Sequence, residues 1–214
     1  MKSYLITCKG CEERMVDTEA HLREHSVPYQ VFRGLNGKHS GVKTAIPYTA
    51  DDPSGKYFVT PGHIALNINH WFLWGEALRS GEDVTLVMED DIRVVHGFNA
   101  YLNARIRDVT EIDPGWQFIY VGHFEGWDNP EARLDCYEWK KGSVGKCKRD
   151  PFGTHCYVVR KTALPILIEK CERLYAGIDI NIWTNAMPHL RHYACVPPLA
   201  KQQRTGIYST SSLA

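Results

Sequence analysis

The sequence predicts a single α/β domain in which a mostly parallel sheet is flanked by helices. Its first 37 residues or so follow the order strand, helix, strand, which is the spacing of a parallel βαβ unit. Two later apolar runs, residues 84–88 and 118–121, are typical of strands buried on both faces. A chain of 214 residues fits one domain, with a small, polar and loosely ordered tail expected over about 205–214.

Local patterns place the elements of the first 60 residues. Residues 3–7 (SYLIT) predict a buried strand, residues 12–25 a helix and residues 29–32 (YQVF) a second strand. Residues 38–59 are polar and rich in Pro, Asp, Ser and Gly, so they predict a long loop. Loops of this length in compact domains are often functional.

A second helix is predicted from Thr60 to about Gly81. Thr60 is a favoured N-cap, Pro61 suits the first turn, and Gly81 is a plausible C-terminal stop. Apolar residues at helical spacing lie between them, and the strand at 84–88 (VTLVM) follows.

The second half continues the alternation of helices and strands. A helix carrying Phe98, Leu102 and Ile106 precedes the strand at 118–121 (FIYV). Residues 122–154 are polar and show little periodicity, which predicts irregular structure. A strand is expected at 156–159 (CYVV), and a last helix is marked by Leu164, Leu167, Ile168, Cys171 and Leu174.

The composition argues against several classes of partner. Hydrophobic residues make up 43% and charged residues 23% of the chain, close to globular averages. The formal net charge is zero, whereas proteins that bind nucleic acid or anionic membranes usually carry a strongly basic face. No stretch approaches the roughly 18 to 20 apolar residues of a membrane span.

The N-terminus and the cysteines indicate a cytoplasmic, soluble protein. The segment MKSYLITCKGCEE has too few apolar residues before charge returns to be a signal peptide. Seven cysteines are spread along the chain, and reduced thiols are the simplest interpretation of an odd number without a secretory signal.

Three adjacent carboxylates, Glu89, Asp90 and Asp91, follow the strand at 84–88 directly. Like charges this close repel each other, and burial worsens the repulsion unless something positive lies there. Carboxylate oxygens are the ligands that Mg²⁺ and Mn²⁺ prefer, and α/β sheets bind ligands at the carboxyl ends of their strands. A metal bound with a nucleotide diphosphate fits this pattern; an acidic segment that only opens a loop or caps the next helix is the alternative.

Residues 84–94 (VTLVMEDDIRV) are similar to the LVLEDD segment of glycosyltransferase family 25, the lipooligosaccharide galactosyltransferase and procollagen galactosyltransferase group. Further segments resemble this family in the same order along nearly the whole chain: Tyr4-Leu5-Ile6 with Arg14, FRGLNG at 32–37, residues 62–78 with Asn69-His70, GTHCY at 153–157, Ile178-Asp179, and Pro197-Pro198-Leu199 with Gln202-Gln203. Asn69 replaces the usual serine of the family.

The resemblance implies a GT-A-type, Rossmann-like fold, inverting transfer from a UDP-sugar, and a Mn²⁺ or Mg²⁺ cofactor. Asp91 is the expected metal ligand, and Asp90 is either a second ligand or a contact to the ribose. His155 is a further candidate ligand, with a histidine hydrogen-bonded inside the core as the alternative. Glu89 is expected to orient its neighbours.

The resemblance also implies residues that contact the donor. They are Thr7, Arg14, Asn36, His70, Glu89 and Gln203. Two of these have ordinary structural alternatives: His70 could be a core histidine satisfied by the backbone, and Arg14 could be a solvated residue of the first helix.

Asp179 is the expected catalytic base. Inverting transfer needs a carboxylate to accept the proton of the acceptor hydroxyl, on the side of the sugar away from the diphosphate. Asp179 matches the late aspartate of the family, and a helix N-cap is the alternative. Trp127 and Trp139, in the irregular segment, are candidates for stacking on an acceptor sugar, whereas Trp116 is expected in the core.

The cysteines are expected to be incidental. Cys8 and Cys11 form a CxxC, but Cys136 and Cys147 are too far apart in sequence to complete a typical zinc site. Two other functions are alternatives to a glycosyltransferase. One is a carbohydrate-binding relative that has lost catalysis, and the other is a metal-dependent phosphohydrolase, which would normally show a second cluster of metal ligands.

Overall fold

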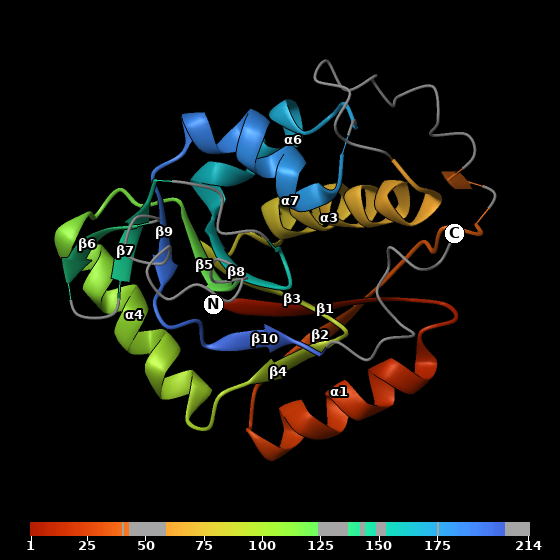
Figure 1. Ribbon diagram of the computed structural model, residues 1–214, viewed down its shortest axis with the longest axis horizontal. Coiled ribbons are helices and arrows are strands. Elements are labelled where there is room, and N and C mark those ends of the chain that lie inside the picture. Colours follow the sequence, from red (N-terminus) through yellow and green to blue (C-terminus); the bar gives the residue numbers. More distant parts are fainter. Residues whose placement is uncertain are drawn as a thin grey trace.

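A computed structural model gives the arrangement of the chain (Figure 1). It describes residues 1–39, 41–42, 59–123, 137–141, 144–148, 153–174 and 176–203. Most of the loop predicted at 38–59, the tail predicted over about 205–214, and Trp127 lie outside the described residues, as do Asp128, Cys136 and the side chain of Trp139.

Ten described strands form one sheet. They are β1 (Lys2–Cys8), β2 (Gln30–Gly34), β3 (Val84–Glu89), β4 (Ile92–Val94), β5 (Phe118–Gly122), β6 (Tyr137–Lys141), β7 (Val144–Cys147), β8 (Cys156–Arg160), β9 (His192–Cys195) and β10 (Ala200–Gln202). The strand order is β2-β1-β3-β8-β5-β9-β7-β6, and β10 pairs with β4 and β5. Seven of these strands run in one direction, while β4, β7 and β8 run in the other.

Helices cover both faces of the sheet. Figure 1 shows α3 (Pro61–Ser80), α6 (Leu164–Lys170) and α7 (Ile178–Asn181) on one face, and α1 (Glu12–Glu24) and α4 (Phe98–Ile112) on the other. A π-helical turn, Ile182–Ala186, continues α7. The predicted α/β fold class is therefore confirmed, including the parallel β1-α1-β2 unit at the start of the chain.

The alternation of side chains along the strands divides the core into two parts. Tyr4 and Ile6 of β1 face the α3 and α6 side, where they pack with Leu73 and Trp74. Leu5, between them, faces the opposite side with residues of α1 and α4. Both faces of the sheet are buried, as the continuous apolar runs predict.

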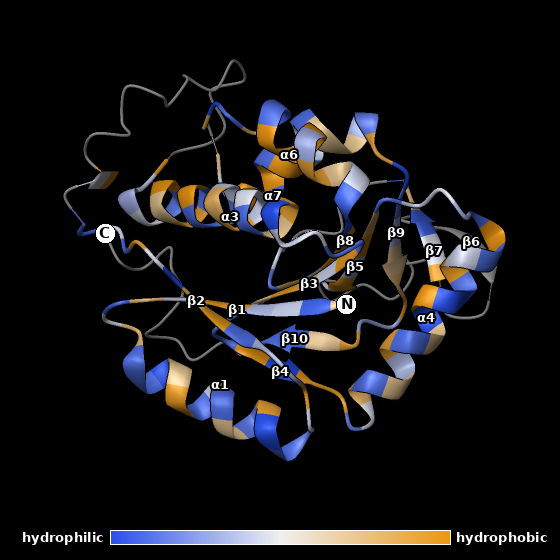
Figure 2. Cartoon of the chain, turned by 180° about the vertical axis from the view of Figure 1, so that it is seen from behind, coloured by the Kyte–Doolittle hydropathy of each residue, from blue (hydrophilic) through white to orange (hydrophobic). Residues whose placement is uncertain are grey.

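The two helices that follow β1 and β2 bury different amounts of their surface. The 20 residues of α3 include nine buried ones, whereas α1 buries only Met15, Thr18 and Leu22. Figure 2 shows the same contrast, with hydrophobic residues along much of α3 and a largely hydrophilic α1. The helix α3 is thus largely buried against the sheet, whereas α1 is mostly exposed at the surface of the protein.

Both ends of α3 lie where the sequence predicts them. The Thr60 hydroxyl accepts a hydrogen bond from the His63 N–H at 3.2 Å, and the Thr60 N–H donates to His63 Nδ1 at 3.3 Å, forming a reciprocal capping box. Gly81 ends the helix with a φ of +80°, a left-handed conformation that glycine adopts without strain.

Removing this cap is expected to weaken the fold. Thr60→Ala should lower the free energy of unfolding by about 1 kcal/mol, because the His63 N–H loses its acceptor. Urea unfolding followed by circular dichroism measures the change. Thr60→Ser keeps the hydroxyl and is the matched control; equal losses in the two variants would contradict the capping role.

Several elements differ from the sequence-based expectation. The strands β4, β9 and β10 were not predicted, and the segment 122–154, predicted to be irregular, contains the paired strands β6 and β7. The last predicted helix ends at Lys170, and Leu174 lies beyond it, packed with Ile64 and Ala65 of α3. Among the described helices, none combines the length and the apolar character needed to cross a bilayer.

Candidate functional site

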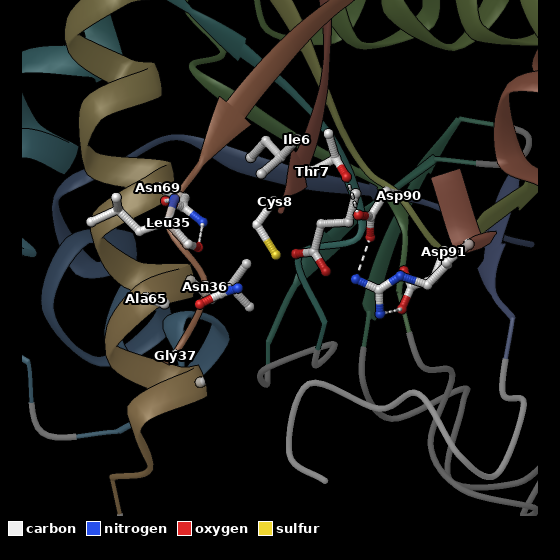
Figure 3. A pocket seen from close by; sticks show the side chains of 14 residues that line it. Ile6, Thr7, Cys8, Leu35, Asn36, Gly37, Ala65, Asn69, Asp90 and Asp91 are labelled. Atoms are coloured by element: carbon white, nitrogen blue, oxygen red, sulfur yellow. Dashed lines mark hydrogen bonds and ion pairs between the residues drawn. The ribbon is translucent and has the colours of Figure 1, made fainter. Parts of the chain in front are cut away.

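The carboxyl ends of the parallel strands β1 and β3 meet at one edge of the sheet, and the acidic cluster lies there. Glu89 is the last residue of β3, and Asp90 and Asp91 follow it. Their exposed fractions are only 8%, 3% and 4%. They line a pocket that opens to solvent. Residues from β1, α1, the end of β2 and α3 line it as well: Ile6, Thr7, Cys8, Arg14, Leu35, Asn36, Gly37, Gly62, Ala65, Leu66 and Asn69 (Figure 3).

Both carboxylate oxygens of Asp90 are engaged by the protein. Thr7 Oγ1 donates to Oδ2 at 2.6 Å, and Arg14 Nη2 lies 2.5 Å from Oδ1 (Figure 3). Thr18 Oγ1 donates to the Asp90 carbonyl at 2.7 Å. Burial raises the pKa of Asp90 to about 6, although Arg14 and the Thr7 hydroxyl oppose the shift. Part of the positive charge that the acidic cluster requires therefore comes from Arg14.

Asp91 is held differently. Its Oδ2 accepts from Gln202 Nε2 at 2.8 Å and lies 3.8 Å from Arg14 Nη1, and its carbonyl accepts from the Gln203 N–H at 2.5 Å. Burial and the charge of Glu89 raise the pKa of Asp91 to about 6, against Arg14 and Gln202. Its other oxygen, Oδ1, is buried and has no hydrogen-bond partner among the described residues. A buried carboxylate oxygen with unused acceptor capacity fits a bound divalent cation.

Glu89 is fixed from behind the pocket. Oε1 accepts from Thr154 Oγ1 at 2.9 Å and from His70 Nε2 at 3.3 Å. Burial raises the pKa of Glu89, but the hydrogen bond and charge of His70, the charge of His155 and the hydrogen bond from Thr154 together hold the pKa below its ordinary value. His70 Nδ1 lies 2.9 Å from the Tyr157 hydroxyl, which accepts from Trp74 Nε1 at 2.8 Å. Because His70 Nε2 donates to Glu89, Nδ1 is the acceptor of the Tyr157 proton in the neutral ring.

His70 therefore contacts Glu89 and does not line the pocket. It has no exposed surface, and the structure shows it positioning Glu89; a direct contact with the donor stays a prediction. The physical reason is its place on the sheet-facing side of α3, next to Trp74.

Replacing His70 is expected to destabilise the protein strongly. His70→Phe keeps a ring of similar size but leaves Glu89, a buried carboxylate, with Thr154 as its remaining side-chain donor, which should cost about 3 kcal/mol of unfolding free energy. The measurement is chemical denaturation. In the double variant His70→Phe/Glu89→Gln the loss should be smaller, since no buried charge remains; strictly additive losses would show that the pair is not coupled.

Asn69 fixes the backbone at the mouth of the pocket. Its Oδ1 accepts from the Leu35 N–H at 2.7 Å, and its Nδ2 donates to the Leu35 carbonyl at 2.9 Å. A Cβ at Gly34 would lie 2.3 Å from the Asn69 side chain, so glycine is needed for this close approach. Asn36, the next residue, lines the pocket and donates from Nδ2 to the Lys9 carbonyl at 2.6 Å.

Comparison with known proteins places the chain in a family. The model described as "Glycosyltransferase family 25 (LPS biosynthesis protein)" matches residues 1–182. The chain belongs to glycosyltransferase family 25. It is similar to procollagen galactosyltransferase 2 of Mus musculus, with 26% identity over 125 residues, which is 56% of this chain and 20% of that protein.

Family 25 also includes relatives whose names say that they are inactive. The chain is 31% identical over 139 residues to "Inactive glycosyltransferase 25 family member 3" of Mus musculus, covering 61% of this chain and 23% of that protein. This chain thus spans about a fifth of the length of these curated relatives.

Solved structures resemble the chain weakly. A glycosyltransferase involved in the glycosylation of the major capsid of PBCV-1 is 12% identical with a TM-score of 0.49, covering 99% of this chain and 96% of that one. The mannosyltransferase PcManGT from Pyrobaculum calidifontis, in complex with GDP-Man and Mn²⁺, is 12% identical with a TM-score of 0.49, covering 94% and 56%. Similarity at this level bears on neither substrate nor mechanism.

His155 lies next to the acidic cluster, but it is not among the residues that line the pocket. Its carbonyl accepts the Glu89 N–H at 2.9 Å, and its ring packs so closely on Gly122 that a Cβ there would lie 2.7 Å from it. Burial lowers the pKa of His155, although the charge of Glu89 opposes this. Its role as a metal ligand stays a prediction.

The predicted ligands do not form a closed cage. Among the described residues, the group of three ligand side chains that lie within 4.8 Å of one another is His21, Glu24 and His25 on α1, not Asp90, Asp91 and His155. A cation at the acidic cluster would therefore need ligands beyond these side chains, and Mg²⁺ commonly keeps several waters.

Asp179 lies in the first turn of α7 and is not its N-cap, which is Gly177. Its Oδ1 accepts the Ile180 N–H at 2.9 Å, and its Oδ2 lies 3.4 Å from the Gly153 N–H. The alternative of an N-cap is thus not what the structure shows. Asp179 is partly exposed and lies outside the pocket lining, near the segment that carries His155.

Some site residues were missed from the sequence. Gln202, rather than Gln203, contacts the Asp91 carboxylate through its side chain, and Thr18 holds the Asp90 backbone. Among the described residues, Gln203 contacts Asp91 only through a hydrogen bond from its backbone N–H. The closing motif around Pro197 pointed to this region, but only the pairing of β10 with β4 shows which glutamine reaches the site.

The cysteines separate into two locations. Cys8 and Cys11 lie beside the pocket, whereas Cys147 is on β7, with β3, β8, β5 and β9 between it and β1. That separation is incompatible with one ion shared by Cys8, Cys11 and Cys147. Trp116 is fully buried, as expected for a core residue.

Proposed function

We propose that this chain is an inverting glycosyltransferase that moves a hexose, galactose or glucose, from a UDP-sugar to a hydroxyl of a glycan or glycosylated acceptor. The observation that carries the proposal is Asp91. Its carboxylate is buried at the end of β3, lines the pocket, and keeps one oxygen without a donor among the described residues. Membership of family 25 supports sugar transfer as the reaction class.

The donor diphosphate is proposed to bind with Mn²⁺ or Mg²⁺ at Asp91. Asp90 is the weaker candidate for a ligand, because Thr7 and Arg14 already occupy both of its oxygens. A bound cation would act as a Lewis acid that neutralises the charge building on the departing diphosphate. Arg14, which lies against both aspartates, supplies further positive charge at the same place.

The nucleotide is proposed to contact the pocket wall formed by Thr7, Asn36 and Gly37. Asn69 supports this wall through its two hydrogen bonds to the Leu35 backbone. Glu89, which His70 and Thr154 fix, would set the orientation of the strand end. Trp127 and Trp139 remain the proposed acceptor-stacking residues.

Asp179 is the proposed catalytic base. A carboxylate there would take the proton from the acceptor hydroxyl as its oxygen attacks the anomeric carbon, and the diphosphate would leave with the electron pair of the broken glycosidic bond. Its separation from the Asp91 pocket agrees with a base that acts across the sugar from the diphosphate.

A thermal-shift screen of nucleotide-sugars with and without Mn²⁺ tests the proposal. A nucleotide-sugar at about 100 times its dissociation constant should stabilise the fold by roughly 2.7 kcal/mol, and only when the metal is present. Slow release of UDP from a stabilising UDP-sugar would then identify the transferase.

Two other outcomes would reject the proposal in different ways. Metal-dependent stabilisation without any UDP release, with or without glycan acceptors, would indicate an inactive carbohydrate-binding relative, as the names of some family 25 members suggest. Release of phosphate from phosphate monoesters would indicate a phosphohydrolase.

A further inference from the structure

Cys8 and Cys11 lie side by side at the turn that joins β1 to α1. Their Sγ atoms are 3.2 Å apart. The Cys11 N–H donates to the Cys8 carbonyl at 3.2 Å, and Gly10 between them has a φ of +93°. This is the pattern of a tight turn with glycine at its third position, which no L side chain would favour. The turn therefore holds the two thiols together before any bond forms.

The thiol pair is joined to the acidic cluster through Arg14. The same guanidinium nitrogen, Nη2, lies 3.3 Å from Cys11 Sγ and 2.5 Å from Asp90 Oδ1. Cys8 itself lines the pocket, and Figure 3 shows its sulfur directed towards the space between Asn36 and Asp90. A chemical change at the Cys11 sulfur therefore alters the contacts of Arg14, the residue that compensates the charge of Asp90.

Cys11 differs from other described cysteines in the direction of its pKa shift, whereas the hydrogen bond with Cys11 and burial raise the pKa of Cys8 well above its ordinary value. The hydrogen bond from Cys8 and the charge of Arg14 lower the pKa of Cys11 to about 7, despite its burial. Burial raises the pKa of Cys171 and Cys195 to about 12 and that of Cys156 well above its ordinary value. Because the thiolate is the nucleophile in disulfide exchange, oxidation should select the pair at the pocket.

We propose that Cys8 and Cys11 are a redox modification site that takes a low-molecular-weight disulfide such as glutathione disulfide, and that its closure weakens nucleotide binding in the adjacent pocket. The second half of this proposal rests on the proposed function.

The exchange proceeds in two balanced steps. The Cys11 thiolate attacks one sulfur of the small disulfide, forms a mixed disulfide and releases one thiolate. The Cys8 thiol then loses its proton, attacks the Cys11 sulfur and expels the second thiolate. The protein loses two electrons and two protons, and one small disulfide becomes two thiols.

Closure has a geometric consequence for Arg14. The sulfurs must move from 3.2 Å to about 2.05 Å apart, and Cys11 can no longer carry negative charge opposite Arg14. Cys11 is the N-cap of α1, and Arg14 lies one turn further along the helix, so the movement changes how the guanidinium meets Asp90. With Asp90 less well compensated, the three clustered carboxylates would repel a diphosphate more strongly.

Peptide mapping after equilibration in glutathione buffers tests the modification site. The protein is held at a series of ratios of reduced to oxidised glutathione, its remaining thiols are blocked, and digested peptides are analysed by mass spectrometry. The expected result is a Cys8–Cys11 linkage that forms and reverses with the ratio, while Cys156, Cys171 and Cys195 stay reduced. Absence of that linkage at every ratio would overturn the proposal.

Calorimetry with UDP and Mn²⁺ tests the effect on binding. We expect the oxidised protein to bind UDP at least about tenfold more weakly than the reduced protein, and a thiol reductant to restore the affinity. Cys11→Ser should show the same affinity in both buffers, whatever that affinity is, and Cys195→Ser should keep the response. Equal affinities of the oxidised and reduced unsubstituted protein would overturn the regulatory half.

The two proposals fail in distinguishable ways. If the reduced protein bound no UDP, the proposed function and the effect on binding would both be rejected. The peptide map would still decide by itself whether the cysteines form a redox site.

Discussion

Asp91→Asn is expected to abolish the gain in UDP affinity that a divalent metal provides. The change removes one ligand charge at nearly constant volume, and an asparagine oxygen can still accept the hydrogen bond from Gln202. An amide nitrogen at the position of Oδ1, which has no partner among the described residues, would place a donor where a cation needs an acceptor. Turnover should fall on the order of a hundredfold to ten-thousandfold, because charge stabilisation of the leaving diphosphate is lost.

Titration calorimetry of UDP, in Mn²⁺ and in EDTA, measures this effect. The unsubstituted protein should bind far more tightly with the metal, and the variant equally weakly in both conditions. Asp83→Asn is a matched control, since it removes an aspartate charge from an exposed position just before β3, at the end remote from the site. If the unsubstituted protein bound UDP equally with and without metal, the proposed metal site would be wrong.

Asp179→Asn is expected to lower turnover by roughly a hundredfold or more while leaving donor and metal binding unchanged. Asparagine can still accept the Ile180 N–H through its oxygen, so the first turn of α7 keeps its shorter side-chain hydrogen bond. It cannot accept a proton from the acceptor hydroxyl. A variant that binds the donor normally but turns over slowly has lost a base, whereas loss of a residue that only supports the fold would also weaken binding or stability.

Steady-state kinetics with the true acceptor, together with UDP calorimetry and a melting curve, measure these quantities. Near-normal turnover would remove Asp179 as the base. Attention would then pass to Asp128, outside the described residues, or to His123. The latter is a poor base: it donates from Nε2 to the Cys195 carbonyl at 2.8 Å, and burial lowers its pKa to about 4.

The fold could be predicted where its determinants are local. Thr60 and Gly81 mark both ends of α3 through capping chemistry that lies within a few residues, and the apolar run at 84–88 shows a strand buried on both faces. The strands β4 and β10 are only three residues each, and they exist because they pair with each other across more than 100 residues. No local pattern shows such a pairing. The hairpin of β6 and β7 was missed because its polar sequence lacks the apolar alternation of the central strands.

The candidate site shows the same division. Glu89, Asp90 and Asp91 are contiguous and end a buried strand, so their grouping could be predicted from the chain alone. The hydrogen bond from Gln202 depends on where β10 docks, and the burial of His70 depends on which face of α3 meets the sheet. The periodicity of apolar residues could predict neither the position of β10 nor the buried face of α3. The charge of the acidic cluster was expected to require a cation, and part of the compensation proved to be Arg14.

The hydrogen bond between Gln202 and Asp91 joins residues 111 positions apart, which has a consequence for the growing chain. At ribosomal speeds of about 5–20 residues per second, Asp91 is made on the order of ten seconds before the glutamine that holds it. During that interval β1, α1 and β3 can already be present, together with Thr7 and Arg14, and Asp90 can be compensated. The Asp91 carboxylate would acquire its Gln202 partner only when β10 arrives. The proposed diphosphate site should therefore be complete only after most of the sheet has folded and β10 has been made.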